Sequence, residues 1–458
     1  MIVKIIDEKN NTFWLIFHFL LGIGCSFFPE LIILFLYLVL LLSFNQIIST
    51  ILFNGSKVTF LASMIYVSSF EVFARMNQTS PFIPWELSKY IFIFIGITSL
   101  FNFNVLLKKS MLIPFMLFLL LPGAFLDLSM EVSFNQIIFN LFGLVSLISL
   151  LFFIDGIYVD EDILNSFLKL IWLPLTSILF YVIIKTPDYS DLIFSLNANR
   201  MTAGGFGSNQ VSTMLGAGMF LSFYAWMNKL NFTGYHMLDG ILIGLFAYQG
   251  FMTFSRGGMI IGIISIFIYF FLFRGARDYF FLSKQKALKP FYFFITALFV
   301  IITSYILILR LSDGNVAKRY QGETETTLSG EKNKTLNTIT TGRYNIMLSD
   351  LELWDNNFLF GTGVGASKLL RKNIKYKAAS HNEFSRLVAE HGLFGLTFII
   401  ILFYLFFQNY FSYGRTIYSA LIVAMFFIGV GTMLHSSMRT FIPTIFISLS
   451  FLKIKRVL

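Results

Sequence analysis

The sequence predicts an all-α protein, built as a polytopic transmembrane helical bundle. Of the 458 residues, 56% are hydrophobic and only 13% are charged, whereas about 25% of the residues of an ordinary soluble domain are charged. The mean hydropathy is +0.75, and apolar runs of roughly 20 residues, the length of a membrane-spanning helix, recur along the chain. A soluble fold of this length has no interior large enough to bury so much apolar surface. We therefore expect much of it to face lipid.

Hydropathy places the candidate spans in order along the chain. Because several of the apolar runs are short, we expect about 12 to 14 spans. The candidate spans are 13–28, 30–52, 58–74, 88–106, 111–126, 134–154, 163–185, 211–228, 235–254, 258–274, 290–310, 392–411, 416–434 and 440–453.

Basic residues between the spans predict the orientation. Loops on the cytoplasmic side carry an excess of Lys and Arg, and a cytoplasmic N-terminus places Lys108, Lys109 and the basic stretch 274–289 on that side. The net charge of +10 is then explained by cytoplasmic loops and by contact with anionic lipid or substrate. We expect no nucleic-acid partner.

Two long connections lie on the opposite, outer side in this orientation. One covers about 186–210, and the other is an outer loop at 311–391 inserted between late spans. Apolar residues at helical spacing from Arg343 to Trp354 predict a short amphipathic helix within the outer loop. Residues 1–458 otherwise form a single transmembrane domain.

Arginines at the predicted membrane edge are the first functional candidates. Arg256 stands in Thr253-Phe254-Ser255-Arg256-Gly257-Gly258 between two apolar runs, where a guanidinium is costly and usually functional. The plainer interpretation is an arginine that extends to the lipid headgroups. The two glycines favour function, because they would let backbone approach a ligand closely.

A second group lies in the outer loop. Arg343 follows Gly342, and the alternating glycines of Gly361-Thr362-Gly363-Val364-Gly365 suggest a turn whose N–H groups face an anion. The alternative is a flexible loop. Arg371 and Lys372 begin a basic run that is either a substrate contact or a solvated face.

The segment Ser380-His381-Asn382-Glu383 opens the next predicted helix. Ser380 and Glu383 fit a capping box, and Glu383, Arg386 and Glu390 share one helix face at spacings of three and four residues. His381 would sit at the start of this helix, within reach of a substrate. Its plainer interpretation is a hydrogen-bonded loop imidazole.

The other outer connection ends in a glycine-rich segment. It contains Arg200 and ends at Asn209 and Gln210, so it could form a re-entrant bend that places polar side chains near the bilayer boundary.

These residue types suit transfer from a phosphate-linked donor. A pyrophosphate leaving group develops negative charge, which arginines stabilise with paired N–H groups and without a metal. A histidine is suited to accept the proton of an acceptor hydroxyl near neutral pH. The sequence has no P-loop and no His-Glu-x-x-His motif, so we expect neither a nucleotide-driven pump nor a metal or other cofactor.

The chain resembles the O-antigen polymerase and O-antigen ligase superfamily of bacterial membrane glycosyltransferases. Four elements carry the resemblance in order between about 195 and 400, while the first half matches in hydropathy alone. They are Gly204-Gly205-Phe206-Gly207-Ser208-Asn209-Gln210; Ser255-Arg256-Gly257-Gly258; Gly342-Arg343 with Gly361-Thr362-Gly363-Val364-Gly365; and His381-Asn382-Glu383-Phe384 continuing to Glu390-His391-Gly392.

The resemblance implies an inverting, metal-independent glycosyltransferase at the outer face of the cytoplasmic (inner) membrane. Its donor and acceptor would be glycans on undecaprenyl pyrophosphate. Arg256 and Arg343 would hold the pyrophosphate, and His381 would act at the acceptor hydroxyl. Further substrate contacts are expected from Arg200, Asn209, Gln210, Asn382, Arg371, Lys372 and Glu390.

The reaction itself stays open between alternatives. A polymerase joins repeat units into O-antigen or a related surface polysaccharide, and the divergent first half favours it. A ligase would instead transfer the finished glycan to lipid A core in lipopolysaccharide. A lipid-linked oligosaccharide flippase, which is not an enzyme, would place charges along the middle of its spans. A polysaccharide chain-length regulator is a further candidate partner.

Overall fold

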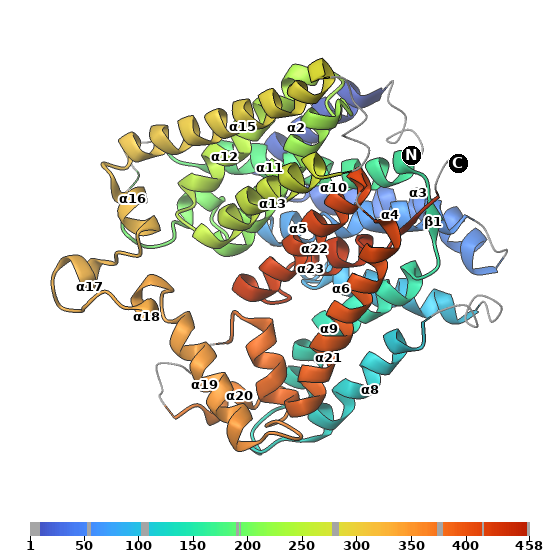
Figure 1. Cartoon of the computed structure of the whole chain (residues 1–458), viewed down its shortest axis with the longest axis vertical. Helices are drawn as coiled ribbons and strands as arrows, with labels where there is room; N and C mark the ends of the chain where they lie inside the picture. The colour runs from blue at the N-terminus through green and yellow to red at the C-terminus, as the bar shows by residue number, and fades with distance from the viewer. Residues whose placement is uncertain are drawn as a thin grey trace.

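The computed structural model describes residues 10–52, 56–101, 110–188, 192, 194–276, 284–372, 379–414 and 416–455. Residues 1–9 and both Lys108 and Lys109, on which the predicted orientation partly rests, lie outside these ranges. Helices make up the described architecture, and the two short strands, β1 (Tyr158–Val159) and β2 (Lys453–Ile454), pair in parallel near the C-terminus (Figure 1). The predicted all-α class is confirmed.

Long helices form the body of the molecule. In chain order they are α2 (Asn11–Phe27), α3 (Leu31–Leu52), α4 (Lys57–Ser68), α5 (Glu71–Met76), α6 (Leu87–Thr98), α8 (Leu112–Phe125), α9 (Phe134–Ile154), α10 (Glu161–Lys185), α11 (Ser208–Asn228), α12 (His236–Met252), α13 (Arg256–Arg274), α15 (Lys284–Leu311), α21 (Glu383–Tyr413), α22 (Ile417–Ser436) and α23 (Phe441–Leu449).

Several of these helices can cross a bilayer. Within the described residues, 8 helical stretches are long and apolar enough, and α2, α6 and α8 are shorter apolar helices. The chain is therefore a multi-pass membrane protein. The 8 stretches are Leu31–Thr50, Lys57–Met76, Phe134–Ile154, Glu161–Lys185, Arg256–Arg274, Pro290–Leu311, Glu383–Tyr413 and Ile417–Ser436.

The helix α11 is not among these stretches, and protein encloses it almost completely. It packs between α12 and α13 and also contacts α10, and nearly all of its side chains are buried. A helix in this position need not be apolar toward lipid, so serines, threonines and glycines are tolerated along it. These small residues allow close packing of neighbouring helices.

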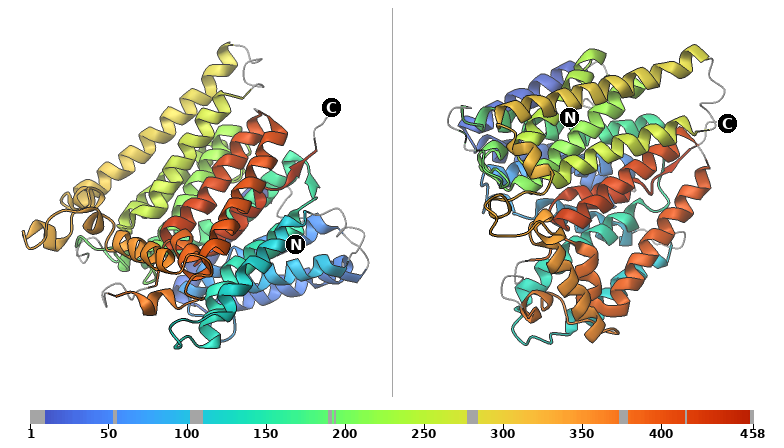
Figure 2. Two further views of the ribbon diagram at one scale, coloured as in Figure 1. Left: turned by 60° about the horizontal axis from the view of Figure 1, so that its bottom comes forward. Right: turned by 60° about the vertical axis from the view of Figure 1, so that its left-hand side comes forward.

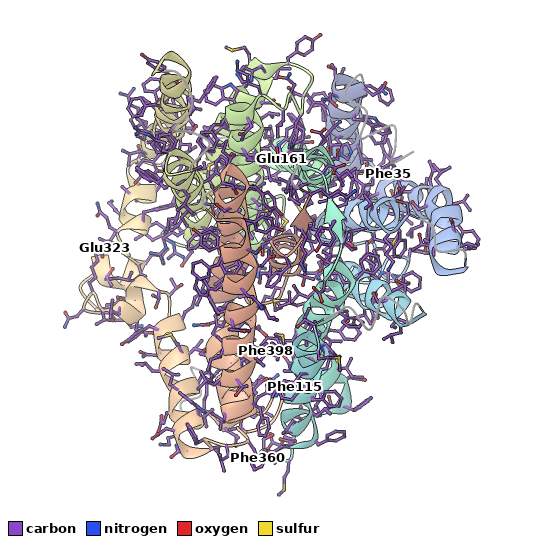
Figure 3. All side chains as sticks on the ribbon, turned by 45° about the vertical axis from the view of Figure 1, so that its right-hand side comes forward. Phe35, Phe115, Glu161, Glu323, Phe360 and Phe398 are labelled. Carbon is purple, nitrogen blue, oxygen red and sulfur yellow. The ribbon has the colours of Figure 1, made fainter. Side chains whose placement is uncertain are left out.

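Phenylalanine side chains point both into the bundle and away from it (Figure 3). Phe398 is 0% exposed, while Phe115 is 45% exposed on the outside of α8. Large exposed apolar side chains are expected where a helix surface faces lipid acyl chains.

A chain of short helices connects α15 to α21. It consists of α16 (Asn315–Tyr320), α17 (Glu325–Leu328), α18 (Leu336–Ile339), α19 (Arg343–Asn356) and α20 (Ser367–Leu370). Figure 2 shows α16 to α18 gathered at one end of the long, roughly parallel helices α12, α13, α15 and α22. The helix predicted from Arg343 to Trp354 is present as α19.

The helix α19 is held to α21 by a buried polar contact as well as by an apolar one. Asp350 is 0% exposed. It accepts hydrogen bonds from Arg371 Nη2 at 2.6 Å and from Ser385 Oγ at 2.8 Å. Ile346 is the apolar residue buried beside it. The first residue of α19, Arg343, is therefore fixed relative to the start of α21.

Candidate active site

A cavity of about 510 Å³ lies where several helices end. We call it the arginine cavity, because Arg256, Arg319 and Arg343 line it and none of its described wall residues is Asp or Glu. The rest of the wall consists of Asn209, Ser255, Gly257, Ile260, Tyr320, Ile339, Thr340, Thr341, Tyr344, Met347, His381, Asn382, Leu434 and His435. Such a cavity has an uncompensated positive charge.

Arg256 is the first residue of α13. Its Nη1 donates to the carbonyl oxygen of Arg319 at 2.9 Å, and its Nη2 donates to the carbonyl oxygen of Ile339. These bonds hold α16 and α18 against the start of α13. A guanidinium carries five N–H donors, so three remain for a ligand in the cavity.

The two glycines after Arg256 serve packing between helices. A Cβ on Gly257 would overlap the His435 ring of α22, and a Cβ on Gly258 would overlap the backbone of Ser212 in α11. The expected close approach is therefore between this backbone and the protein's own helices. Gly257 still shapes the cavity, because it allows His435 to lie in the wall.

Arg343 begins α19 after Gly342, which has a φ of 84°. Its Nη1 donates to the carbonyl oxygen of His435 at 3.3 Å. Burial, and then the charges of Arg256 and Arg439, lower the pKa of Arg343 to about 10. Arg343 thus remains charged at neutral pH, in surroundings that favour the arrival of an anion.

Arg319 was not identified from the sequence. It is 7% exposed, and its Nε and Nη1 are buried without a hydrogen-bond partner among the described residues. Burial, followed by the charges of Arg256 and Arg343, lowers the pKa of Arg319 to about 10. An unpaired buried guanidinium is costly, so these N–H groups indicate a binding partner that is an anion.

His381 faces the same cavity from the start of α21. Its Nδ1 is buried and has no hydrogen-bond partner in the described part of the chain. Burial, and then the charges of Arg439 and Arg343, lower the pKa of the imidazole to about 3. The ring is therefore neutral at physiological pH and keeps one ring nitrogen as a hydrogen-bond acceptor, while the same surroundings make it a weak base.

The predicted capping box is wrong, although the helix begins where it was expected. The cap of α21 is Asn382, whose Oδ1 accepts from the backbone N–H of Phe384 at 3.0 Å and of Ser385 at 3.3 Å. Asn and Ser are comparably good caps, so the pattern alone did not separate them. Glu383 is instead free to pair with Arg386.

His435 is a second histidine that the sequence did not reveal. Its Nε2 lies 3.2 Å from Thr213 Oγ1, and its Nδ1 lies 3.2 Å from the carbonyl oxygen of Gly431. With both ring nitrogens engaged, His435 forms a fixed part of the wall. Its position at the end of an apolar helix carried no motif that could have predicted this.

The predicted substrate contacts Arg200, Asn209 and Gln210, which lie before and at the start of α11, contribute one residue to the arginine cavity. Asn209 lines it and accepts a hydrogen bond from Ser255 Oγ at 2.7 Å. Gln210 lines a neighbouring cavity, where it accepts from Arg75 Nη1 at 3.2 Å. Arg200 is exposed and is not part of the arginine cavity.

The remaining predicted substrate contacts lie outside the arginine cavity. Arg371 is buried in its ion pair with Asp350, and Lys372 is 82% exposed and pairs with Glu352. Glu390 accepts from Ser367 Oγ at 2.9 Å and lines the neighbouring cavity. The structure therefore gives Arg371 a role in positioning α19.

The glycine-rich turn packs against backbone. The amides of Thr362 and Gly363 donate to the carbonyl oxygens of Ala389 and Glu390, at 2.9 and 3.0 Å. Val364 N donates to Gly123 O at 2.9 Å. These amides are thus not available to an external anion, and the turn instead joins α19 and α20 to α8 and α21.

Residues 240–400 match the family model described as O-antigen ligase. This O-antigen ligase region includes Arg256, Arg319, Arg343, His381 and Asn382. The match confirms the resemblance seen in the motifs and supports an O-antigen ligase- or polymerase-type membrane enzyme. No curated protein and no solved structure matches the chain.

Part of the cavity wall comes from outside the O-antigen ligase region. Asn209 precedes it on α11, and His435 follows it on α22. The matched region therefore supplies the cations, and the flanking helices complete the cavity around them.

Proposed function

We propose that the protein is a polymerase that joins undecaprenyl-pyrophosphate-linked oligosaccharide repeat units into O-antigen or a related surface polysaccharide. One observation carries the proposal. Three guanidinium groups and one unpartnered imidazole share a single cavity whose described wall holds no carboxylate. This set of groups suits a diphosphate beside an acceptor hydroxyl.

The arginines bind the pyrophosphate of the donor. Charge-assisted hydrogen bonds from guanidinium groups to phosphate oxygens are about twice as strong as neutral ones. The N–H groups of Arg319 gain the partner that they lack among the described residues. The same contacts strengthen as negative charge develops on the leaving group, which is how fixed cations accelerate such a step.

The transfer is a single displacement. The oxygen of the acceptor hydroxyl bonds to the anomeric carbon of the donor sugar, while the bond from that carbon to the pyrophosphate oxygen breaks. The electron pair leaves on undecaprenyl pyrophosphate, and the acceptor proton passes to the His381 ring. Attack opposite the leaving group inverts the anomeric configuration, and the arginines supply the charge that a metal would otherwise provide.

The bound donor also changes the pKa of the His381 imidazole. After burial, the charges of Arg439 and Arg343 contribute to the low pKa of this imidazole. A diphosphate carries negative charge that offsets these arginines, so the pKa of the imidazole rises when the donor binds. His381 then becomes a stronger base when it has a substrate to act on.

The position of the cavity at helix ends supports a reaction at one face of the membrane. Arg256, Asn209 and His381 lie at or beside the N-terminal ends of their helices, and His435 lies near the C-terminal end of α22. We place this face on the outer side of the cytoplasmic membrane, with the N-terminus inside. The segment from α16 to α20 is then the outer loop predicted at 311–391.

A ligase that transfers the glycan to lipid A core is the second candidate, because the matching family model is described as O-antigen ligase. Cells that lack the protein distinguish the two. Loss of a polymerase leaves lipid A core carrying a single repeat unit. Loss of a ligase leaves finished polymer on its lipid carrier.

The central test compares the variant Arg319→Ala with the control variant Lys318→Ala. Lys318 precedes Arg319 on α16 but is exposed and does not line the cavity. In cells complemented with each variant, we expect Arg319→Ala to reduce polymer by on the order of 100-fold at a normal protein level. Lys318→Ala should give wild-type chain lengths. Wild-type polymer from Arg319→Ala would refute the proposal.

A further inference from the structure

A second cavity of about 420 Å³ lies beside the first. We call it the charged cavity, because Arg75, Lys89, Lys368, Arg386 and Arg439 line it together with Glu86, Glu383 and Glu390. The other wall residues that matter here are the amides Asn135, Gln136, Asn140 and Gln210 and the rings of Trp85 and Phe139.

The two cavities share a wall. Neighbouring residues in three segments face opposite cavities: Asn209 and His381 line the arginine cavity, whereas Gln210 and Ser380 line the charged cavity. In the third segment, His435 lines the arginine cavity and Ser437 lines the charged cavity. A few residues of backbone therefore separate them.

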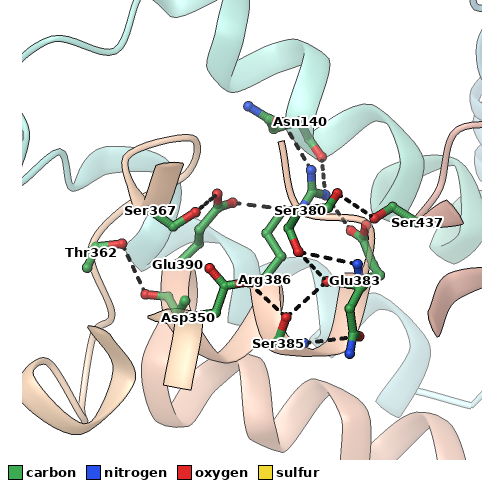
Figure 4. A network of polar contacts seen from close by, with 12 residues as sticks. Asn140, Asp350, Thr362, Ser367, Ser380, Glu383, Ser385, Arg386, Glu390 and Ser437 are labelled. Carbon is green, nitrogen blue, oxygen red and sulfur yellow. Dashed lines mark hydrogen bonds and ion pairs between the residues drawn. The ribbon is translucent and has the colours of Figure 1, made fainter. Parts of the chain in front are cut away.

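The charges in the second cavity are arranged by pairing. Glu86 pairs with Arg75 at 3.3 Å and also with Lys89. Arg386 pairs with Glu383 and donates to Asn140 Oδ1 at 3.0 Å. Figure 4 shows Arg386 between Asn140 and Glu383, with Ser380 and Ser437 beside them. Most of the cavity's charges are thus internally satisfied.

One carboxylate oxygen and one guanidinium group at this cavity have no such partner. Glu383 is 0% exposed, and its Oε2 has no hydrogen-bond partner among the described residues. The guanidinium of Arg439 likewise has no hydrogen bond or ion pair within the described ranges, and it borders the cavity. One free acceptor and one free donor therefore face the same space.

The wall as a whole has the chemistry of a sugar-binding site. Sugar hydroxyls both donate and accept hydrogen bonds. Side-chain amides can also do both, whereas the carboxylates of this wall accept and its guanidinium groups donate. Trp85 is 47% exposed, and Arg75 lies 5.5 Å from the centre of its ring. An aromatic ring at a polar cavity offers a flat apolar face on which a sugar ring can pack.

We propose that the charged cavity binds the sugar residues of the acceptor glycan. Glu383 accepts from a sugar hydroxyl and Arg439 donates to one. The acceptor hydroxyl then reaches His381 across the shared wall, while the donor pyrophosphate lies in the arginine cavity. This inference rests on the proposed function and divides that one site into two subsites.

The test measures binding of two probes to the full-length protein in lipid nanodiscs. One probe is undecaprenyl pyrophosphate. The other is the repeat-unit oligosaccharide released by mild acid from the lipid-linked material of cells that lack the protein. The blocking variant is Asn135→Trp, because Asn135 lines the charged cavity at an exposed position and the larger ring would obstruct access to it. The control is Phe134→Trp, because Phe134 is the exposed neighbour on α9 and is not part of that wall.

We expect Asn135→Trp to weaken oligosaccharide binding more than about tenfold, as the loss of hydrogen bonds to charged groups predicts. It should leave undecaprenyl pyrophosphate binding unchanged, and Phe134→Trp should change neither. Glu383→Gln should weaken the binding of the oligosaccharide alone. Arg319→Ala should have the reverse effect and weaken the binding of undecaprenyl pyrophosphate alone.

The two ideas fail in different ways. The acceptor subsite is overturned if Asn135→Trp still binds the oligosaccharide. It is also overturned if this variant no longer binds undecaprenyl pyrophosphate. The second result would mean that the charged cavity holds phosphate. If Arg319→Ala still binds undecaprenyl pyrophosphate, the placement of the donor in the arginine cavity is overturned, whether or not the oligosaccharide binds.

Discussion

The backbone N–H of Ser437 donates a hydrogen bond to the carbonyl oxygen of His381 at 3.0 Å. Ser437 has a φ of 54° at the break between α22 and α23. Its hydroxyl also donates to the carbonyl oxygen of Ser380 at 3.1 Å. The break between two C-terminal helices therefore positions the segment that carries the candidate base, and this relation suggests the first prediction.

Ser437→Pro should inactivate the protein, whereas Ser437→Gly should keep it active. Proline has no N–H and fixes φ near −65°, so it removes the bond to His381 and moves the chain. Glycine keeps the amide and adopts positive φ readily. A displacement of the base by about 1 Å can cost on the order of 100-fold in rate.

The measurement is the amount and length of polymer in complemented cells, with membrane protein levels as the control. Equal activity of the two variants would show that the position of His381 does not depend on this bond.

The low pKa of His381 predicts a specific loss of stability in acid. The unfolded chain takes up a proton at this residue below about pH 6.5, but the folded protein does so only near pH 3. The stability contributed by the neutral ring is therefore complete above pH 6.5 and is lost as the pH falls from 6.5 toward 3. Because His381→Gln cannot titrate, it should lose less stability than the wild type over this range.

The midpoint of thermal unfolding of the purified protein at pH 7 and at pH 5 tests this. The other buried histidines titrate alike in both proteins, so the difference isolates His381. An equal fall in the midpoint for both proteins would contradict the prediction.

Arg371→Ala should destabilise the protein far more than Lys372→Ala. Removing Arg371 leaves Asp350 charged and buried without its partner, which costs about 3–5 kcal/mol. Lys372 pairs with Glu352 on the surface, and an exposed pair contributes about 0–1 kcal/mol. Unfolding midpoints in detergent measure the difference, and similar midpoints for the two variants would argue against a structural role for the buried pair.

Gly257→Ala should disturb the arginine cavity, whereas Gly275→Ala should not. The new Cβ at 257 overlaps the His435 ring, while at 275 its nearest neighbour is 3.5 Å away. Overpacking of this kind costs about 1–3 kcal/mol. Both glycines lie at ends of α13, so the pair controls for a change of helix propensity. Polymer length in cells and unfolding midpoints are the readouts, and full activity with normal stability for Gly257→Ala would contradict the packing role.

Hydropathy was sufficient to predict the fold class, because a bilayer requires long apolar helices whatever their tertiary arrangement. The motifs also brought together Arg256, Arg343 and His381, which meet in one cavity although 125 residues separate the first from the last. Each stands at a helix end next to glycine or a capping residue, so each left a local pattern in the sequence.

Other features left no such pattern. Arg319 is one basic residue in a polar stretch, and only the arrangement of α16 over α13 makes it buried and unpaired. Gly257 was predicted to let backbone approach a ligand, and Gly363 to turn its N–H toward an anion. The sequence could not show that a neighbouring helix packs against the first and that backbone carbonyl oxygen accepts from the second. Contacts between distant segments decide both cases.

The attachment to α13 of the segment between α15 and α21 has a consequence for the evolution of that segment. Arg256 holds that segment through the carbonyl oxygens of residues 319 and 339, and every amino acid offers the same oxygen. The side chain at 339 can therefore be exchanged without loosening the attachment. Other side chains of this segment that do not line the arginine cavity can vary in the same way, as long as Arg256 at the start of α13 and the cavity residues Arg319 and Arg343 are kept.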